Sequence, residues 1–252
     1  MIRSIKTIMR QDREPYRVPR RVQDVIPIQC VWPDGIFKVG IKFSKTYRFT
    51  DINYKVASRN DKETMFLAYS ELLNSLDCAA TTKLTICNRR QSQADFEQSV
   101  LMPMQEDGLD KYRREYNQML MDKATGANGI TQEKYVTITV YKRDIEDARA
   151  YFARIGADLT ARFAALGSKC VELDATDRLR ILHDFYRAGD EGNFHFDMAD
   201  MARKGHDFKD YICPDGIEKH SDYLKLGDRY CRVLFLKDYA NYIQDEDRKS
   251  VV

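Results

Sequence analysis

The segment Tyr135–Leu173, YVTITVYKRDIEDARAYFARIGADLTARFAALGSKCVEL, contains a strand, a helix and a strand in succession. Its first seven residues alternate, with branched apolar side chains at positions 136, 138 and 140, and this pattern predicts a strand with one buried face. From 145 to 166 the apolar residues recur every three or four positions, which predicts an amphipathic helix. Gly167 is expected to end this helix, and KCVEL predicts the second strand.

The same order of elements occurs earlier, over residues 47 to 88. A helix is predicted from Asp61 to Leu76, with Asn60 and Glu63 resembling a capping box, and TKLTICN predicts the strand that follows, with Leu84 and Ile86 on one side. The residues expected on the apolar face of this helix are Met65, Phe66, Tyr69, Leu72, Leu73 and Leu76.

Two strand-helix-strand units in series give the β-α-β-β-α-β order of a ferredoxin-like sandwich, here over 47–173. The helix predicted from Leu109 to Asp122 is inserted between the two units. Right-handed crossovers would place both main helices on one face of the sheet. The predicted fold class is therefore α+β, with a single α+β domain over 25–252.

The flanks of this core add strands on both sides. Over 25–55 the sequence predicts a β-meander, with a hairpin turn at Asp34-Gly35 and a continuation through Ser44-Lys45. Over 174–252 it predicts an extension: a helix from Thr176 to Ala188 closed by Gly189, a loop-rich stretch, and a C-terminal hairpin. The hairpin turns at Gly227-Asp228, and its second strand is predicted from Tyr230 to Leu236, with Cys231, Val233 and Phe235 on one face.

The stretch Lys123–Tyr135, KATGANGITQEKY, has the small residues of a phosphate-binding loop but not their order. A Walker loop needs a strand, then G-x-x-x-x-G-K-[ST], then a helix, whereas here the lysine precedes the glycines and a strand pattern follows them. We interpret the stretch as a helix terminus, in which Gly126 or Asn128 ends the preceding helix and Gly129 turns the chain into the strand. No other segment fits the Walker pattern or G-x-G-x-x-G.

Composition narrows the class of protein further. The 252 residues are 43% hydrophobic, which is sufficient for a substantial core, and no apolar run reaches the length of a membrane span or a signal peptide. Six cysteines lie far apart and never as C-x-x-C, so neither a zinc knuckle nor a disulfide scaffold is indicated. These features predict a cytoplasmic protein.

The sequence offers no pattern for catalysis, a cofactor or a metal. The four histidines lack H-E-x-x-H spacing, no G-x-S-x-G is present, and the acids at 245–247 belong to a charged run that is expected to face solvent. The segment HDFKDYICPD gathers a histidine, a cysteine and three aspartates. We interpret it as a structural segment in which Phe208, Tyr211 and Ile212 are buried and the acids face water.

A basic arm is predicted over Met1–Asp24. Although the net charge of the whole chain is only +2, this arm holds seven basic residues against three acids, and two prolines interrupt it. An extended or disordered arm of this kind could contact anionic lipid or nucleic acid, or could be a solvated tail without a partner. Its candidate contact residues are Arg3, Lys6, Arg10, Arg13, Arg17, Arg20 and Arg21.

Long strings of the sequence resemble one protein family. These strings begin RSIKTIMRQDREPYRVPRRVQDVIPIQCVWPDGIFKVG and FSKTYRFTDINYKVASRNDKETMFLAYSELLNSLD. They continue with MDKATGANGITQEKYVTITV, DIEDARAYFARIGADL, HDFKDYICPDGIE and LGDRYCRVLFLKDYANYI. Together they resemble the opening region of the large conjugation ATPases of bacterial type IV secretion systems, the TraE/TrsE class of the VirB-type ATPase family.

Members of that family continue into a RecA-like motor domain that carries Walker motifs, whereas this sequence ends at DEDRKSVV. The resemblance therefore implies the non-motor N-terminal domain, and no catalytic or nucleotide-binding residue is carried over. It also implies a docking role near the cytoplasmic membrane, with inner-membrane subunits of the secretion channel or other ATPase copies as partners.

Three hypotheses about function follow. The first is a non-catalytic assembly domain that takes part in conjugative DNA transfer. The second is a nucleic-acid-binding module that uses the basic arm and aromatics such as Tyr112, Tyr116 and Tyr135. The third, a hydrolytic or metal enzyme, is disfavoured because the required residue spacings are missing from the sequence.

Overall fold

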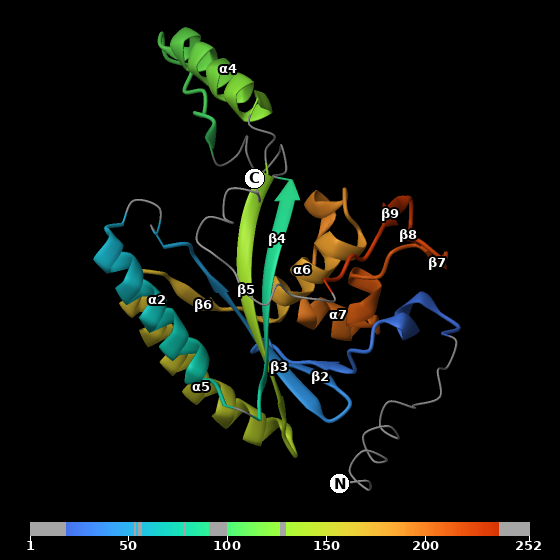
Figure 1. The fold of residues 1–252 in the computed structure, drawn as a ribbon. Coiled ribbons are helices and arrows are strands. Elements are labelled where there is room, and N and C mark those ends of the chain that lie inside the picture. Colours follow the sequence, from blue (N-terminus) through green and yellow to red (C-terminus); the bar gives the residue numbers. More distant parts are fainter. Residues whose placement is uncertain are drawn as a thin grey trace, which may run out of the picture. The chain divides into compact units, whose positions relative to one another are not determined.

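The computed structural model describes residues 19–52, 54, 57–77, 79–90, 100–126 and 130–236. The chain divides between Cys213 and Pro214 into two compact units. The first unit is a mixed α+β structure built on an antiparallel sheet, and the second is a small three-stranded sheet (Figure 1). The predicted α+β class is thus confirmed, while the extension predicted over 174–252 is divided between the two units.

The meander is formed by β1 (Cys30–Val31), β2 (Phe37–Val39) and β3 (Lys42–Phe49), which pair antiparallel in succession. The hairpin predicted at Asp34-Gly35 is confirmed. Gly35 adopts a φ of +77°, which favours glycine, and its N–H donates to the carbonyl of Trp32 at 2.9 Å.

The other strands of this sheet are β4 (Thr81–Arg90), β5 (Ile130–Tyr141) and β6 (Cys170–Glu172). β5 lies between β3 and β4, whereas β6 pairs with β3 on the edge away from β5. All these pairings are antiparallel. The four strands of the predicted core consequently follow the order β6-β3-β5-β4 across the sheet.

Two helices, α2 (Arg59–Asn74) and α5 (Ile145–Ala165), share one hydrophobic core with one face of this sheet (Figure 1). β3 and β5 contribute Phe43, Tyr47, Val136, Ile138 and Val140 to this core, and α5 contributes a full stripe of buried residues. The helix and strand predicted over Tyr135–Leu173 are confirmed, because α5 ends one residue before the predicted position and β6 covers the centre of KCVEL.

Helix α2 differs from its prediction in two respects. Its N-cap is Ser58, whose side chain accepts a hydrogen bond from the N–H of Asp61 at 3.2 Å, so the predicted capping box at Asn60 was wrong. The predicted apolar face was also wrong in part. Leu72 is buried and Met65 and Leu76 are half-buried, but Phe66, Tyr69 and Leu73 are exposed. Phe66 and Leu73 lie more than a quarter of a turn away from Leu72.

A second core joins the meander to the segment after β6. It contains residues of the 3-10 helix η1 (Val22–Val25) and of β2, α6 (Ala175–Tyr186) and η3 (Phe208–Tyr211). The helix predicted from Thr176 to Ala188 is confirmed as α6. The stretch expected to be loop-rich contains two short helices, η2 (Glu191–Asn193) and α7 (Met198–Lys204). Asp197 caps α7, because its side chain accepts from the N–H of Ala199.

Arg178 of α6 fixes this second core to the meander. Its guanidinium is buried, donates to the carbonyls of Gly35 and Ser44 at 2.7 Å each, and lies 3.9 Å from the centre of the Phe37 ring. Burial lowers the pKa of Arg178 to about 9, because the charged form loses hydration.

The second unit contains β7 (Ile217–Lys219), β8 (Leu224–Leu226) and β9 (Arg229–Cys231), paired antiparallel in that order. The predicted turn at Gly227-Asp228 is confirmed, and Gly227 has a φ of +56°. The prediction that the last strand runs to Leu236 was wrong. β9 ends at Cys231, and the residues from Val233 to Leu236 are exposed outside the ladder.

Candidate docking surface

The α4 helix (Asp110–Gly126) lies in the connection between β4 and β5, where the sequence predicted an inserted helix (Figure 1). None of its side chains from 110 to 123 is buried. Four large residues spaced by three, four and three positions are exposed along one side, with Tyr112 at 66% and Tyr116 at 43% of their full areas. This stripe consists of Leu109, Tyr112, Tyr116 and Met119.

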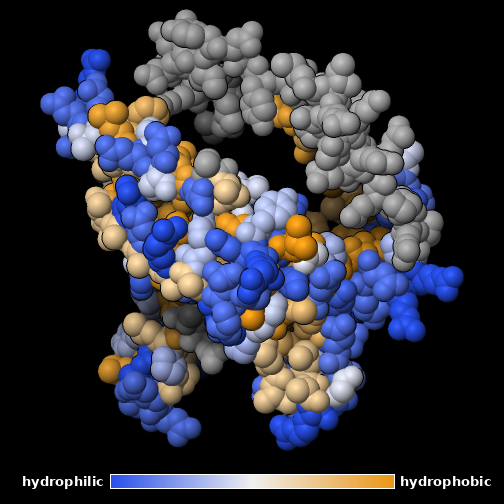
Figure 2. All heavy atoms as spheres, turned by 90° about the horizontal axis from the view of Figure 1, so that it is seen from below, coloured by the Kyte–Doolittle hydropathy of each residue, from blue (hydrophilic) through white to orange (hydrophobic). Residues whose placement is uncertain are grey.

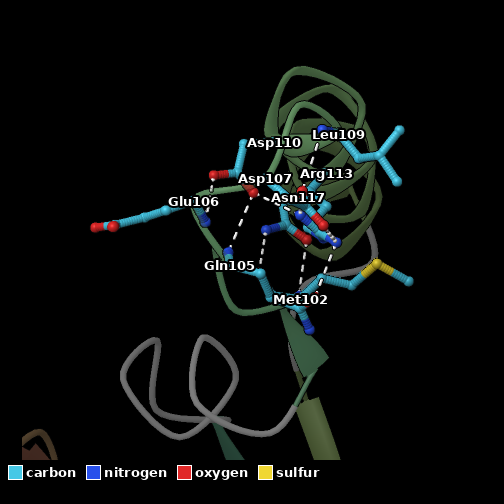
Figure 3. A network of polar contacts seen from close by, with 8 residues as sticks. All are labelled: Met102, Gln105, Glu106, Asp107, Leu109, Asp110, Arg113 and Asn117. Atoms are coloured by element: carbon cyan, nitrogen blue, oxygen red, sulfur yellow. Dashed lines mark hydrogen bonds and ion pairs between the residues drawn. The ribbon is translucent and has the colours of Figure 1, made fainter.

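The turn that precedes α4 is held to the helix by Arg113 (Figure 3). Its guanidinium forms ion pairs with Asp107 and with Asp110, the latter at 2.6 Å, and donates to the side-chain oxygen of Gln105 at 3.1 Å. These hydrogen bonds raise the pKa of Arg113, chiefly through Asp107. The Arg113 side chain is only 15% exposed, since the turn folds around it.

The two carboxylates of this network also fix the backbone of the turn. Asp110 accepts from the N–H of Gln105 at 3.1 Å and from the N–H of Glu106 at 2.9 Å. Its pKa is lowered, first by the backbone hydrogen bond from Gln105 and then by Arg113. The pKa of Asp107 is lowered as well, mainly by its hydrogen bond from Arg113.

Asn117 closes the turn at its other end. Its side-chain amide donates to the carbonyl of Met102 and accepts from the N–H of the same residue, both at 2.9 Å. Figure 3 shows the side chains of Met102 and Leu109 extending to the same side, away from the polar network. We name the set Met102, Leu109, Tyr112, Tyr116 and Met119 the α4 surface.

The α4 surface is suited to binding an apolar surface of another molecule. Its members are large and exposed, four of them follow one side of the helix, and the polar network fixes the turn that carries the fifth, Met102. Tyr and Met side chains are enriched in protein-protein interfaces, and a fixed backbone lowers the entropic cost of association. Large exposed apolar residues also occur elsewhere, and Figure 2 shows hydrophobic residues interspersed among hydrophilic ones on one face.

A groove of about 740 Å³ lies along α5, on a face formed by small residues rather than by large exposed ones. Small residues of α5 line one wall, and the four charged residues that line the groove form two ion pairs. Arg149 lies 2.7 Å from Asp34, and Lys45 lies 2.5 Å from Glu172. Because these charges are already compensated within the chain, the groove offers shape rather than chemistry.

The residues predicted to form the basic arm are placed only in part. Arg3, Lys6, Arg10, Arg13 and Arg17 lie outside the described residues, while Arg20 and Arg21 are described and exposed. The last residues of the predicted arm belong to the folded unit, because Lys209 donates to the carbonyls of Gln23 and Ile26 at 3.3 and 3.0 Å.

The three tyrosines proposed for stacking on nucleic acid are not equivalent. Tyr112 and Tyr116 are exposed on α4, whereas Tyr135 is buried in β5 and its hydroxyl donates to Glu133 at 2.5 Å. The prediction for Tyr135 was therefore wrong. Alternation along a strand does not reveal which face is covered when both faces carry neighbours.

The two other segments that the sequence analysis considered as sites have structural roles. In KATGANGITQEKY, α4 ends at Gly126 and β5 begins at Ile130, which confirms the helix-to-strand connection, although residues 127–129 lie outside the described residues. In HDFKDYICPD, Phe208 and Ile212 are buried, Tyr211 is half-buried, and Asp207 is exposed and caps η3. Within the described ranges, no three histidine, cysteine or acidic residues are grouped so as to hold a metal.

The sequence predicted the inserted helix and singled out Tyr112 and Tyr116, but it did not predict the apolar stripe as a whole or the network that supports it. Spacing by three, four and three residues was available as a signal for the stripe.

Among the helices that the structure describes, none is long and apolar enough to cross a bilayer. No protein-family model and no curated protein matches the chain.

Proposed function

We propose that the chain is the non-catalytic N-terminal assembly and docking domain of a type IV secretion (conjugation) ATPase, which takes part in conjugative DNA transfer. The observation that carries this proposal is the α4 surface, an exposed apolar helix face supported by its own polar network. Such a face binds other molecules through shape and apolar contact and provides no group that reacts.

The finer fold that we propose is a ferredoxin-like sandwich. It is supported by the strand order β6-β3-β5-β4, in which every neighbouring pair is antiparallel. It is also supported by the common core that α2 and α5 form with one sheet face, as right-handed crossovers require. Such a core places the β4-β5 connection, and α4 with it, outside the packed layers.

The proposed partners are inner-membrane subunits of the secretion channel and other ATPase copies, and the proposed location is the cytoplasm at the membrane periphery. Basic residues near an anionic leaflet contribute about 1 kcal/mol each, so the basic arm would support such protein contacts. The sequence resemblance supplies the identity of the partners, and the α4 surface supplies a means of binding them.

A pull-down with detergent-solubilised channel subunits tests the docking function. The purified full chain should retain a channel subunit, and the double variant Tyr112→Ser/Tyr116→Ser should retain at least about tenfold less, because central aromatic residues contribute most to interface affinity. Phe66→Ser is the matched control, since Phe66 is exposed to a similar extent on α2. Equal retention by the double variant and the control would contradict a role for α4.

Flotation with vesicles tests the role of the arm separately. Replacing Arg3, Lys6 and Arg10 by glutamate should reduce the fraction that floats with anionic vesicles, and should leave neutral vesicles unaffected. Unchanged flotation with anionic vesicles would remove lipid from the proposed partners.

A nucleic-acid-binding module is the second candidate, because Tyr112 and Tyr116 are exposed at a spacing that suits stacking. It predicts that affinity for single-stranded DNA falls steeply with salt and falls further when the arm is neutralised. An affinity that does not change between 50 and 200 mM salt would exclude it.

A further inference from the structure

The α4 surface has the same pattern in both chain directions. The spacings of Leu109, Tyr112, Tyr116 and Met119 are symmetric about position 114. If a second copy of α4 lies antiparallel with its position 114 opposite, Leu109 of each copy faces Met119 of the other. Tyr112 of each copy then faces Tyr116 of the other, so all four residues meet an apolar neighbour. Stripes that interlock in this way pack well at small crossing angles.

The charges beside the stripe suit the same arrangement. Lys111 and Glu115 are exposed on the same flank, because they are four residues apart. In the antiparallel pair, Lys111 of one copy and Glu115 of the other are offset by two residues, or about 3 Å along the axis. Glu115 of one copy and Glu115 of the other are offset by the same two residues, so the shared flank carries two positive and two negative charges with no net charge.

The opposite flank is occupied by the turn. Arg113 points toward Asp107 and Asp110, so its charge is compensated within its own copy. Met102, held by Asn117, extends the apolar area on this side (Figure 3). The turn thus enlarges the area that a second copy could cover without adding an uncompensated charge.

The available area matches a reversible dimer. With about 200 Å² for a fully exposed residue of this size, the exposed fractions of the five residues of the α4 surface give roughly 500 Å² per copy. A symmetric pair would then bury about 1,000 Å² in total, which is near the lower limit for specific interfaces. We expect a dissociation constant in the micromolar range rather than a permanent dimer.

We infer that the partner of the α4 surface is the α4 surface of a second copy of this chain, bound antiparallel about a twofold axis at position 114. A twofold arrangement makes every contact occur twice and closes the assembly at two copies. This inference rests on the proposed use of the α4 surface for docking, and channel subunits would then bind the paired form.

Sedimentation equilibrium of the purified full chain tests the pairing. The chain should show a concentration-dependent monomer-dimer equilibrium, and Tyr112→Ser/Tyr116→Ser should weaken it at least about tenfold. Phe66→Ser should leave it unchanged. Far-UV circular dichroism of each variant establishes that its helices are retained.

A charge exchange tests the antiparallel register. Lys111→Glu alone and Glu115→Lys alone should each weaken the dimer, because each gives the shared flank four charges of one sign. The double variant Lys111→Glu/Glu115→Lys should restore it, since the flank again carries two charges of each sign. An equal loss in both single variants and in the double variant would overturn the register.

The remaining outcomes separate this inference from the docking function. A chain that stays monomeric to about 100 μM, well above the micromolar constant expected, or a dimer unaffected by the tyrosine substitutions, would overturn the pairing. Retention of channel subunits by a monomeric chain would overturn the pairing and leave the docking function standing. A dimer that retains no channel subunit would support the pairing and contradict the docking function.

Discussion

Helices α5 and α4 both present apolar residues at three- and four-residue spacing, but they use them differently. α5 buries seven residues, including Phe152 and Leu159, against the sheet. α4 leaves its stripe exposed and is held instead by polar contacts with the turn before it. Even their aspartates differ, because Asp144 caps α5 at its start, whereas Asp110 accepts from amides of the preceding turn.

This difference shows that helical periodicity predicts a helix and not its purpose. Burying a large apolar side chain contributes about 1.5–3 kcal/mol to folding, and α5 obtains that contribution within the chain. The stripe on α4 does not obtain it there, so the same free energy remains available for binding another molecule. Substitutions of equal size should therefore lower the free energy of unfolding in α5 and leave it nearly unchanged in α4.

The largest effect is expected in α5. Phe152→Ala should lower the free energy of unfolding by about 3–5 kcal/mol, because Phe152 is fully buried and its removal leaves a cavity. Chemical denaturation followed by circular dichroism measures this change. Ala153→Ser, at the neighbouring exposed position, is the control and should alter stability by less than about 0.5 kcal/mol. A small effect of Phe152→Ala would show that the buried stripe of α5 contributes little to the stability of the core.

A similar but smaller loss is expected at the meander turn that packs beside α6. Gly35→Ala should cost about 2–4 kcal/mol, because the φ of +77° strains alanine and the added Cβ would lie 2.1 Å from the carbonyl oxygen of Leu173. Gly40→Ala separates the two causes, since Gly40 also has a positive φ, +59°, but an added Cβ meets no atom within 4 Å. Equal losses in both variants would show that the close approach contributes nothing.

Acid should loosen the turn that precedes α4 without unfolding α5, because the turn is held by ionised aspartates and α5 by apolar packing. The pKa values of Asp107 and Asp110 are lowered in the folded turn, so their contribution is complete above the ordinary value of 3.8. It is lost as the pH falls below that value toward the lowered pKa values. Carboxyl carbon chemical shifts in an NMR titration measure both groups.

Arg113→Gln sharpens this test. Without the guanidinium, the pKa values of both aspartates should rise toward the ordinary value, and that of Asp107 should rise more because Arg113 is its main cause. Unchanged titration curves in the variant would contradict the network as the support of the turn.

The smallest effect on stability is expected on the α4 stripe itself. Tyr112→Ser/Tyr116→Ser should change the free energy of unfolding of the monomer by less than about 0.5 kcal/mol per residue, since both side chains are exposed. Denaturation at a low protein concentration, where the monomer dominates, measures this change. A loss comparable to that of Phe152→Ala would show that the stripe is packed within its own chain.

The sequence predicted most of the fold because its elements follow local rules. The alternation around Val136 and the periodicity around Phe152 predicted β5 and α5, and the dipeptides at Gly35 and Gly227 predicted turns. Each of these signals acts over a few residues, so tertiary structure had little opportunity to alter it.

The errors arose where distant contacts decide the outcome. Phe66 and Leu73 fit a helical face by spacing, but of the predicted face only Leu72 is fully buried in the shared core. Tyr135 is buried by neighbours that its own strand cannot reveal. The Arg113 network depends on a turn geometry between Gln105 and Asp110 that no periodic pattern specifies, which is why the candidate surface could be only partly predicted.

The β4-β5 ladder pairs Thr81 with Thr139 through to Arg90 with Ile130, so the register is complete before the chain leaves for α4. A segment inserted at the end of a finished ladder can be exchanged without altering any pair within it. Evolution could therefore replace α4 and its turn as a cassette and give the same scaffold a new binding preference. Grafting the corresponding insertion of another protein between Arg90 and Ile130 would use the same freedom.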